Sequence, residues 1–136
     1  VQPVKRDDPA ELDDLQGIHH ALRRRGHDHP VHSSRVLLPD LGSELAKIDN
    51  VADLMSRNPG VILVTEGHCD ERGSNEYNMS LGEYRALAVR SHLISLGVDS
   101  ARIQTRSYGE EQPVAHGHDE SAWRLNRRVE FVFYEQ

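Results

Sequence analysis

The sequence has little of what usually reveals a function. Only one of its 136 residues is cysteine (Cys69), one is tryptophan, and 5% are aromatic. A single cysteine excludes an internal disulfide, and no apolar run is long enough to cross a membrane. The 16 basic residues are outnumbered by 22 acidic ones, which gives a net charge of -6 and a pI of about 5.8. This balance argues against nucleic acid or an anionic membrane surface as the partner.

Signatures of catalysis are also missing. The sequence contains no internal repeat, no glycine-rich phosphate loop and no nucleophile elbow. His68, Cys69 and Asp70, together with His116 and His118, carry the atom types that bind zinc, but their spacing matches no standard metal motif. We therefore expect no metal, no cofactor and no enzymatic activity.

The most informative stretch runs from Gly67 to Ala86. It follows an apolar, β-branched run at Val61–Val64, which comes after a turn sequence and is typical of a buried strand. A polar loop, residues 70–75, separates this strand from an amphipathic helix. A strand, a polar loop and a helix start are often used to build a binding site, because rigid elements hold both edges of the loop.

The helix is predicted to begin near Ser80, because Glu83 follows three residues later at the spacing of a capping box. It should end near Leu96, where Gly97 supplies a stop signal. Before it, Gly67 and Gly73 are expected to allow backbone conformations that are closed to other residues.

Arg85 interrupts the apolar stripe of this helix. It lies four residues after Leu81 and four before Val89, both of which should face the core. One interpretation is that its aliphatic stem covers apolar surface while the guanidinium reaches water. The other is that Arg85 points at the loop after the strand, where Asp70 is the nearest candidate for the second half of a site.

The remaining pattern alternates helices with strands. Apolar residues at helical spacing predict a helix over 39–58, and a short helix is expected over 119–126. In the last strand, Val129, Phe131 and Phe133 alternate with other residues and should form one face. We expect an α/β (α+β) two-layer sandwich with helices packed on one face of a mixed sheet. The predicted strands are 61–66, 102–107 and 128–134.

The N-terminal part is the least patterned. Residues 1–34 are predicted to be a weakly structured tail, and residues 35–136 a single domain. The tail is rich in histidine around Pro30, a composition that can bind metal, although a polar tail without a site is the simpler interpretation. A first strand, if there is one, is expected around Val31–Leu38.

Several separated motifs, in order, resemble the OmpA-like peptidoglycan-binding domain, and most closely the branch of peptidoglycan-associated lipoproteins. The resemblance spans Val61–Phe133 and implies the same two-layer fold. One departure is that Ile18–Val36 lacks the Phe-Asp or similar signature of the family's first strand. The matching segments are Glu66–Gly73, Glu76–Asn78, Leu81–Glu83, Arg85–Ala86, Ser107–Pro113, Gly117–Glu120 and Asn126–Arg128.

The resemblance also implies a ligand. In the family, positions matching Asp70 and Arg85 hold the diaminopimelate residue of a peptidoglycan stem peptide. This ligand ends in an ammonium and a carboxylate on one carbon, which an aspartate and a bidentate arginine can bind. Further candidates are Leu81, whose backbone N–H would lie at the helix start, Asn78, which would tie the loop, and, from neighbouring motifs, Arg72, Arg127 and Arg128.

The implied protein is a non-catalytic wall-binding module of the Tol–Pal type. It would act on the periplasmic face of the outer membrane and would reach the membrane only through an anchor outside this chain, of the lipoprotein, porin or stator type. The alternative is that the same fold mainly docks a TolB-like periplasmic protein and binds the wall weakly. Titration with a stem peptide separates the two.

Overall fold

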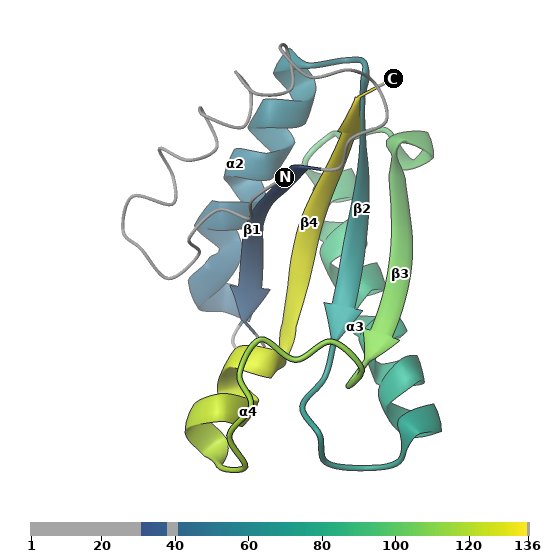
Figure 1. The fold of residues 1–136 in the computed structure, drawn as a ribbon. Helices are drawn as coiled ribbons and strands as arrows, with labels where there is room; N and C mark the ends of the chain where they lie inside the picture. The colour runs from purple at the N-terminus through teal and green to yellow at the C-terminus, as the bar shows by residue number, and fades with distance from the viewer. Residues whose placement is uncertain (1–30, 38–40, 136) are drawn as a thin grey trace.

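The computed structural model describes residues 31–37 and 41–135. Four strands form one mixed sheet in the order β1-β4-β2-β3 (Figure 1). Strand β4 runs antiparallel to both β1 and β2, whereas β2 and β3 are parallel. The strands are β1 (Val31–Leu37), β2 (Val61–His68), β3 (Ile103–Gly109) and β4 (Arg128–Glu135).

Two long helices cover one face of this sheet (Figure 1). They are α2 (Leu45–Arg57), which follows the 3-10 turn η1 (Leu41–Glu44), and α3 (Asn75–Ser95). A second 3-10 turn, η2 (Ser100–Arg102), precedes β3, and the short helix α4 (Glu120–Asn126) precedes β4. The arrangement confirms the predicted two-layer α/β sandwich. No helix in the described part of the chain has the length and apolarity to span a bilayer.

The core lies between the sheet and the two helices. Val129, Phe131 and Phe133 of β4 are fully buried, as their alternation predicted, and belong to one apolar cluster with residues of α2 and α3. The helices contribute Ile48, Val51, Leu54, Met55, Val89 and Leu93. Burial of this apolar surface is the main favourable contribution to folding.

The opposite face of the sheet carries charges, and those on β1, β2 and β4 are buried. The strand register places Arg35 of β1 beside Glu130 of β4, Glu130 beside Glu66 of β2, and Glu66 beside Arg106 of β3. Arg128 Nε donates to Glu130 Oε2 at 2.5 Å, and Arg106 lies 3.9 Å from Glu66. Arginines therefore lie beside both buried carboxylates and compensate their charge.

Strand β1 lies where a first strand was expected. It begins at Val31 and pairs with β4, so it starts inside the segment that we assigned to the tail. The tail up to residue 30, with most of its histidine-rich tract, lies outside the described residues. The boundary between tail and domain therefore stays a prediction.

The predicted start of the second long helix was wrong. Helix α3 begins at Asn75, and the Ser74 side chain caps it by accepting a hydrogen bond from the backbone N–H of Tyr77 at 3.1 Å. Ser80 lies inside the helix, and Glu83 accepts from Thr105 Oγ1 at 2.7 Å. The capping-box spacing was thus a coincidence, since Glu83 serves a contact with β3.

Two glycines bring β2 and α3 into contact. A Cβ atom on Gly67 would lie 1.7 Å from the carbonyl oxygen of Gly82, closer than any real contact. Gly67 is therefore required for this close approach; it does not have the positive φ that we expected. Gly73 does have a positive φ, 89°, which confirms its predicted role in the loop.

Candidate functional site

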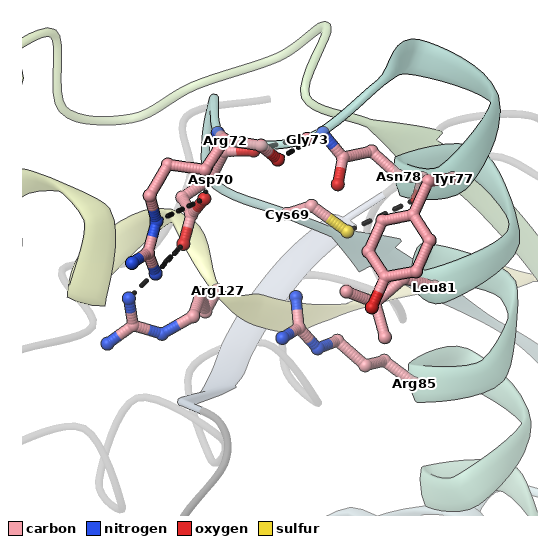
Figure 2. A pocket seen from close by; sticks show the side chains of 9 residues that line it. All are labelled: Cys69, Asp70, Arg72, Gly73, Tyr77, Asn78, Leu81, Arg85 and Arg127. Atoms are coloured by element: carbon pink, nitrogen blue, oxygen red, sulfur yellow. Dashed lines mark hydrogen bonds and ion pairs between the residues drawn. The ribbon is translucent and has the colours of Figure 1, made fainter.

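A pocket of about 300 Å³ lies where β2 ends and α3 begins (Figure 2). Because Gly67 and Gly82 bring these elements together, residues that follow β2 face residues on the first turns of α3. Arg127 enters from the segment between α4 and β4. The lining residues are Cys69, Asp70, Arg72, Gly73, Tyr77, Asn78, Leu81, Arg85 and Arg127.

Most of the predicted site residues meet in this pocket. Six of the lining residues were candidates from the sequence: Asp70, Arg72, Asn78, Leu81, Arg85 and Arg127. Leu81 contributes its side chain and not a free backbone N–H, because α3 starts before it. Arg128 does not line the pocket. It is 2% exposed and donates to Gln112 O, Asn126 O and Glu130, so its role is to hold the chain together beside the pocket.

Sequence reasoning missed Cys69, Gly73 and Tyr77 as lining residues. Tyr77 precedes Leu81 by four residues, and Leu81 precedes Arg85 by four. Side chains at this spacing share one face of a helix. This spacing was present in the sequence, but it could be used only if Ser74, and not Ser80, was known to cap the helix.

Asp70 is already fully engaged by two arginines. Its Oδ1 accepts from the backbone N–H of Arg72 at 3.0 Å and from Arg72 Nε at 3.1 Å. Its Oδ2 accepts from Arg72 Nη2 at 2.8 Å and from Arg127 Nη1 at 3.2 Å. A carboxylate has about four acceptor sites, so Asp70 has no acceptor site left for a further donor.

These contacts determine the ionisation of Asp70. Burial raises the pKa of this carboxyl, but hydrogen bonds from the Arg72 side chain and backbone and from Arg127 outweigh it, and the pKa falls to about 2. The sequence offered Asp70 as the counterpart of Arg85 in one site. The two residues do share the pocket, but they form no ion pair, and the charge partners of Asp70 are Arg72 and Arg127.

Arg85 occupies the other side of the pocket. Its Nη1 donates to the carbonyl oxygen of His68 at 3.0 Å, so its guanidinium points at the end of β2, as the second interpretation of the sequence proposed. Among residues 31–37 and 41–135, no carboxylate lies within ion-pair distance of Arg85. Figure 2 shows its guanidinium facing the hollow opposite Arg127.

Asn78 fixes the loop that carries Asp70. It is buried at the start of α3, and its Nδ2 donates to the carbonyl oxygen of Arg72 at 2.9 Å and to that of Asp70 at 3.4 Å. The same nitrogen donates to Glu110 Oε1 at 2.8 Å. This confirms the predicted tie between Asn78 and the loop and adds a link to the segment after β3.

The outer rim is held by contacts between this loop and α4. The guanidinium of Arg72 stacks 4.4 Å from the centre of the Trp123 ring, an arrangement that favours a cation. Glu71 accepts from Trp123 Nε1 at 2.8 Å. Arg127 donates to both carboxylate oxygens of Glu120, at 2.9 and 2.8 Å. Arg127 is thus fixed at two ends, whereas the Arg72 side chain is 55% exposed.

Cys69 separates the pocket from a second hollow of about 250 Å³, where His116 and His118 lie. The thiol donates to Asn78 O at 3.2 Å, and burial raises its pKa, so it is a neutral thiol. It therefore packs and donates, and it is not poised as a nucleophile or a metal ligand.

The zinc-type residues noted in the sequence, from which we expected no metal site, form no cluster of ligand atoms within the described residues. Within the described residues, one group of three potential metal ligands has its atoms within 4.8 Å of one another, and it is Glu66, His68 and Glu130. Both carboxylates of this group lie within ion-pair distance of arginines.

Comparison with known proteins identifies relatives. Residues 34–127 match the model of the OmpA family. The chain is similar to the peptidoglycan-associated lipoprotein of Pseudomonas aeruginosa, with 50% identity over 67% of this chain and 54% of that protein. It is also similar to that of Legionella pneumophila, with 37% identity over 93% of this chain and 67% of that protein.

A solved structure agrees with these matches. The crystal structure of the peptidoglycan-associated lipoprotein from Burkholderia pseudomallei has a TM-score of 0.65 and 42% identity to the chain, covering 67% of this chain and 77% of that one. The chain spans about half the length of the first curated relatives it matches, 54% and 46%.

Proposed function

This chain belongs to the OmpA family, and from that premise we propose that its pocket binds peptidoglycan through the diaminopimelate residue of a stem peptide. Relatives named as peptidoglycan-associated lipoproteins support the polymer as the ligand. The chemistry of the pocket supports the group within it, since the far end of diaminopimelate carries a carboxylate and an ammonium on one carbon.

The observation that carries the proposal is the state of Arg85. Three arginines and one aspartate line the pocket, and Arg72 and Arg127 are paired with that aspartate. The contacts of Arg85 are with neutral groups, the carbonyl oxygen of His68 and the Cys69 thiol. A ligand carboxylate would give it the ionic partner that it lacks among the described residues, and the planar guanidinium can bind both carboxylate oxygens at once.

The ammonium of the ligand would bind Asp70. Because this carboxylate already accepts four hydrogen bonds, an ammonium can approach only if one donor leaves. The exposed Arg72 side chain is the donor that can leave, since it has Trp123 to stack on, while Arg127 is anchored by Glu120. Binding would thus exchange one cation for another on Asp70, and the carboxylate would never be left uncompensated.

The pocket binds and does not catalyse. The pKa of Asp70 is lowered and its acceptor sites are all used, and the pKa of Cys69 is raised, so that it is a neutral thiol. A general acid or base needs a pKa near neutral pH, and a nucleophilic thiol needs a lowered one, so neither residue is suited to catalysis. In the whole protein the module would link the cell wall to an outer-membrane anchor on the periplasmic side. Docking of a TolB-like partner is the alternative use of the same fold.

The test is calorimetric titration of the chain with a diaminopimelate-containing stem peptide. A matched peptide carrying lysine in place of diaminopimelate keeps the ammonium and removes the carboxylate beside it. We expect saturable binding of the first peptide and a loss of at least tenfold with the second. Equal binding of both would refute the role of Arg85, and no binding of either would favour the protein-docking alternative.

A further inference from the structure

Helix α3 carries an exposed stripe without charges. Six residues at spacings of three and four lie on one face of the helix, and all of them are exposed: Tyr77, Ser80, Tyr84, Leu87, Ser91 and Ile94. Charged residues make up 28% of the chain, and the solvent face of a helix is where they normally gather. An uncharged exposed face along the whole helix therefore indicates a surface that is used.

Two tyrosines dominate this stripe. Tyr84 is 70% and Tyr77 61% exposed, the highest values among the large hydrophobic residues in the described part of the chain. They are seven residues apart, so their rings stand about 10 Å apart along the helix axis. Serine hydroxyls at positions 80 and 91 lie on the same face. Aromatic faces interspersed with hydroxyls suit a ligand that is uncharged, rich in C–H bonds and rich in hydroxyl groups.

The stripe is continuous with the pocket. Tyr77 is the first residue of the stripe and also lines the pocket, and Tyr84 directly precedes Arg85 in the chain. Figure 2 shows the Tyr77 ring at the mouth, beside Leu81 and above Arg85. A ligand anchored by Arg85 and extending along the helix from the pocket would thus meet the two tyrosines.

We propose that this stripe, beginning at Tyr77 and centred on Tyr84, binds the carbohydrate part of the wall polymer. The inference rests on the proposed function, in which the pocket holds a peptide that is attached to a glycan. Sugar rings present one face of C–H bonds, which packs on the electron-rich face of a tyrosine, while their hydroxyl groups can bond to the serines.

A second copy of the chain fits the stripe less well. The six residues lie at the a and d positions of a heptad pattern, but a seam between two helices requires apolar residues at those positions. Ser80 and Ser91 would each bury a hydroxyl in such a seam. On a glycan, by contrast, both serine hydroxyls would find hydrogen-bond partners among the sugar hydroxyl groups.

The experiment compares two ligands with three proteins. The ligands are a free stem peptide and the same peptide carrying its uncharged amino-sugar disaccharide; the proteins are wild type, Tyr84→Ala and Tyr84→Phe. For wild type we expect the disaccharide to tighten binding about three- to tenfold. Tyr84→Ala should remove most of this gain without changing the affinity for the free peptide, and Tyr84→Phe, which keeps the ring, should retain it.

The outcomes separate the two proposals. If the free peptide binds but the disaccharide adds nothing in wild type, or if Tyr84→Ala keeps the full gain, the carbohydrate surface is refuted and the peptide pocket stands. If wild type binds neither ligand, the proposed function fails and the carbohydrate inference falls with it. Sedimentation of the same samples checks the other occupant: a dimer that Tyr84→Ala dissociates would assign the stripe to self-association and overturn the inference.

Discussion

The two charged halves of the pocket are in opposite states. On one side, Asp70 is surrounded by donors from Arg72 and Arg127, and every acceptor site on its carboxylate is used. On the other side, Arg85 contacts one carbonyl oxygen and has no carboxylate partner in the described part of the chain. The aspartate half is assembled without the ligand, whereas the arginine half is incomplete.

This difference between the two halves indicates which residues of the pocket contribute to stability and which contribute to ligand affinity. Removing Asp70 or Arg127 leaves a largely buried charge without its partner, which costs stability. Removing Arg85 breaks one hydrogen bond to a backbone carbonyl but removes the group best able to bind a ligand carboxylate. We therefore expect mutations of Asp70 and Arg127 to affect folding and binding together, and mutations of Arg85 to affect mainly binding.

The largest loss of stability is expected from a change at Gly67, because the contact between β2 and α3 at this residue positions both halves of the pocket. Gly67→Ala would place a Cβ 1.7 Å from the carbonyl oxygen of Gly82 and force β2 and α3 apart. We expect the free energy of unfolding, measured in urea, to fall by about 3 kcal/mol or more. Gly117→Ala is the matched control, because its Cβ would meet only the Ala122 side chain, at 3.2 Å. Similar losses in the two variants would show that the close approach is not required.

Substitution of Arg85 should affect binding more than substitution of any other residue in the pocket. Lysine keeps the charge but cannot form the paired hydrogen bonds of a guanidinium to one carboxylate. We expect stem-peptide affinity to fall about tenfold for Arg85→Lys and about a hundredfold for Arg85→Ala, with little change in melting temperature. Arg90→Lys is the control, since Arg90 lies on the same helix and bonds backbone oxygens away from the pocket. Unchanged affinity in Arg85→Lys would contradict the bidentate contact.

The sequence was sufficient to predict the fold and to bring most of the pocket together. The alternation in β4 and the helical spacing in α2 depend on local periodicity, which a single sequence carries. The pairing of Asp70 with Arg127 does not depend on local periodicity. Arg127 is 57 residues away from it along the chain, and no local pattern indicates which of several arginines reaches a given carboxylate.

The start of α3 was misread for a related reason. Both Ser74 and Ser80 can cap a helix, and the Glu83 that favoured Ser80 is used by Thr105 on another strand. A tertiary contact thus imitated a local signal. The buried charges on the second face of the sheet were also beyond the sequence pattern, because the register that pairs Arg35, Glu130 and Glu66 becomes visible only in the assembled sheet.

Asp70→Asn tests the assembled half directly. The amide keeps the shape but removes the charge that compensates Arg127, which is 12% exposed, and Arg72. We expect a stability loss of about 1–3 kcal/mol in urea unfolding and about tenfold weaker stem-peptide binding at neutral pH. Glu111→Gln, which removes an exposed carboxylate, is the control. Stability and affinity equal to wild type would show that Asp70 neither holds the arginines nor meets the ligand.

The same half should give stability a defined pH dependence. The pKa of Asp70 is lowered from 3.8 to about 2 in the folded protein. A depressed folded-state pKa means that the contribution is fully present above the unfolded value and is lost as pH falls from about 3.8 to about 2. The stability difference between wild type and Asp70→Asn should therefore be constant from pH 7 to about 5 and shrink below 4. A difference that grew on acidification would contradict the assignment.

The smallest change in stability is expected for Arg72→Ala, and this variant tests whether Arg72 can leave Asp70. The Arg72 side chain is 55% exposed, and exposed ion pairs contribute about 1 kcal/mol or less, so stability should change little. Its loss removes two of the four donors on Asp70 but keeps the backbone N–H.

If the ligand ammonium must displace Arg72, the variant should bind the stem peptide as tightly as wild type or up to about threefold tighter, and carboxyl NMR should show the pKa of Asp70 rising toward 3.8. Arg127→Ala is the contrasting variant: the Arg127 side chain is 12% exposed and also pairs with Glu120, so its loss should weaken both stability and binding. A tenfold loss of affinity in Arg72→Ala would mean that Arg72 itself binds the ligand. The proposal that the ligand ammonium displaces Arg72 from Asp70 would then be wrong.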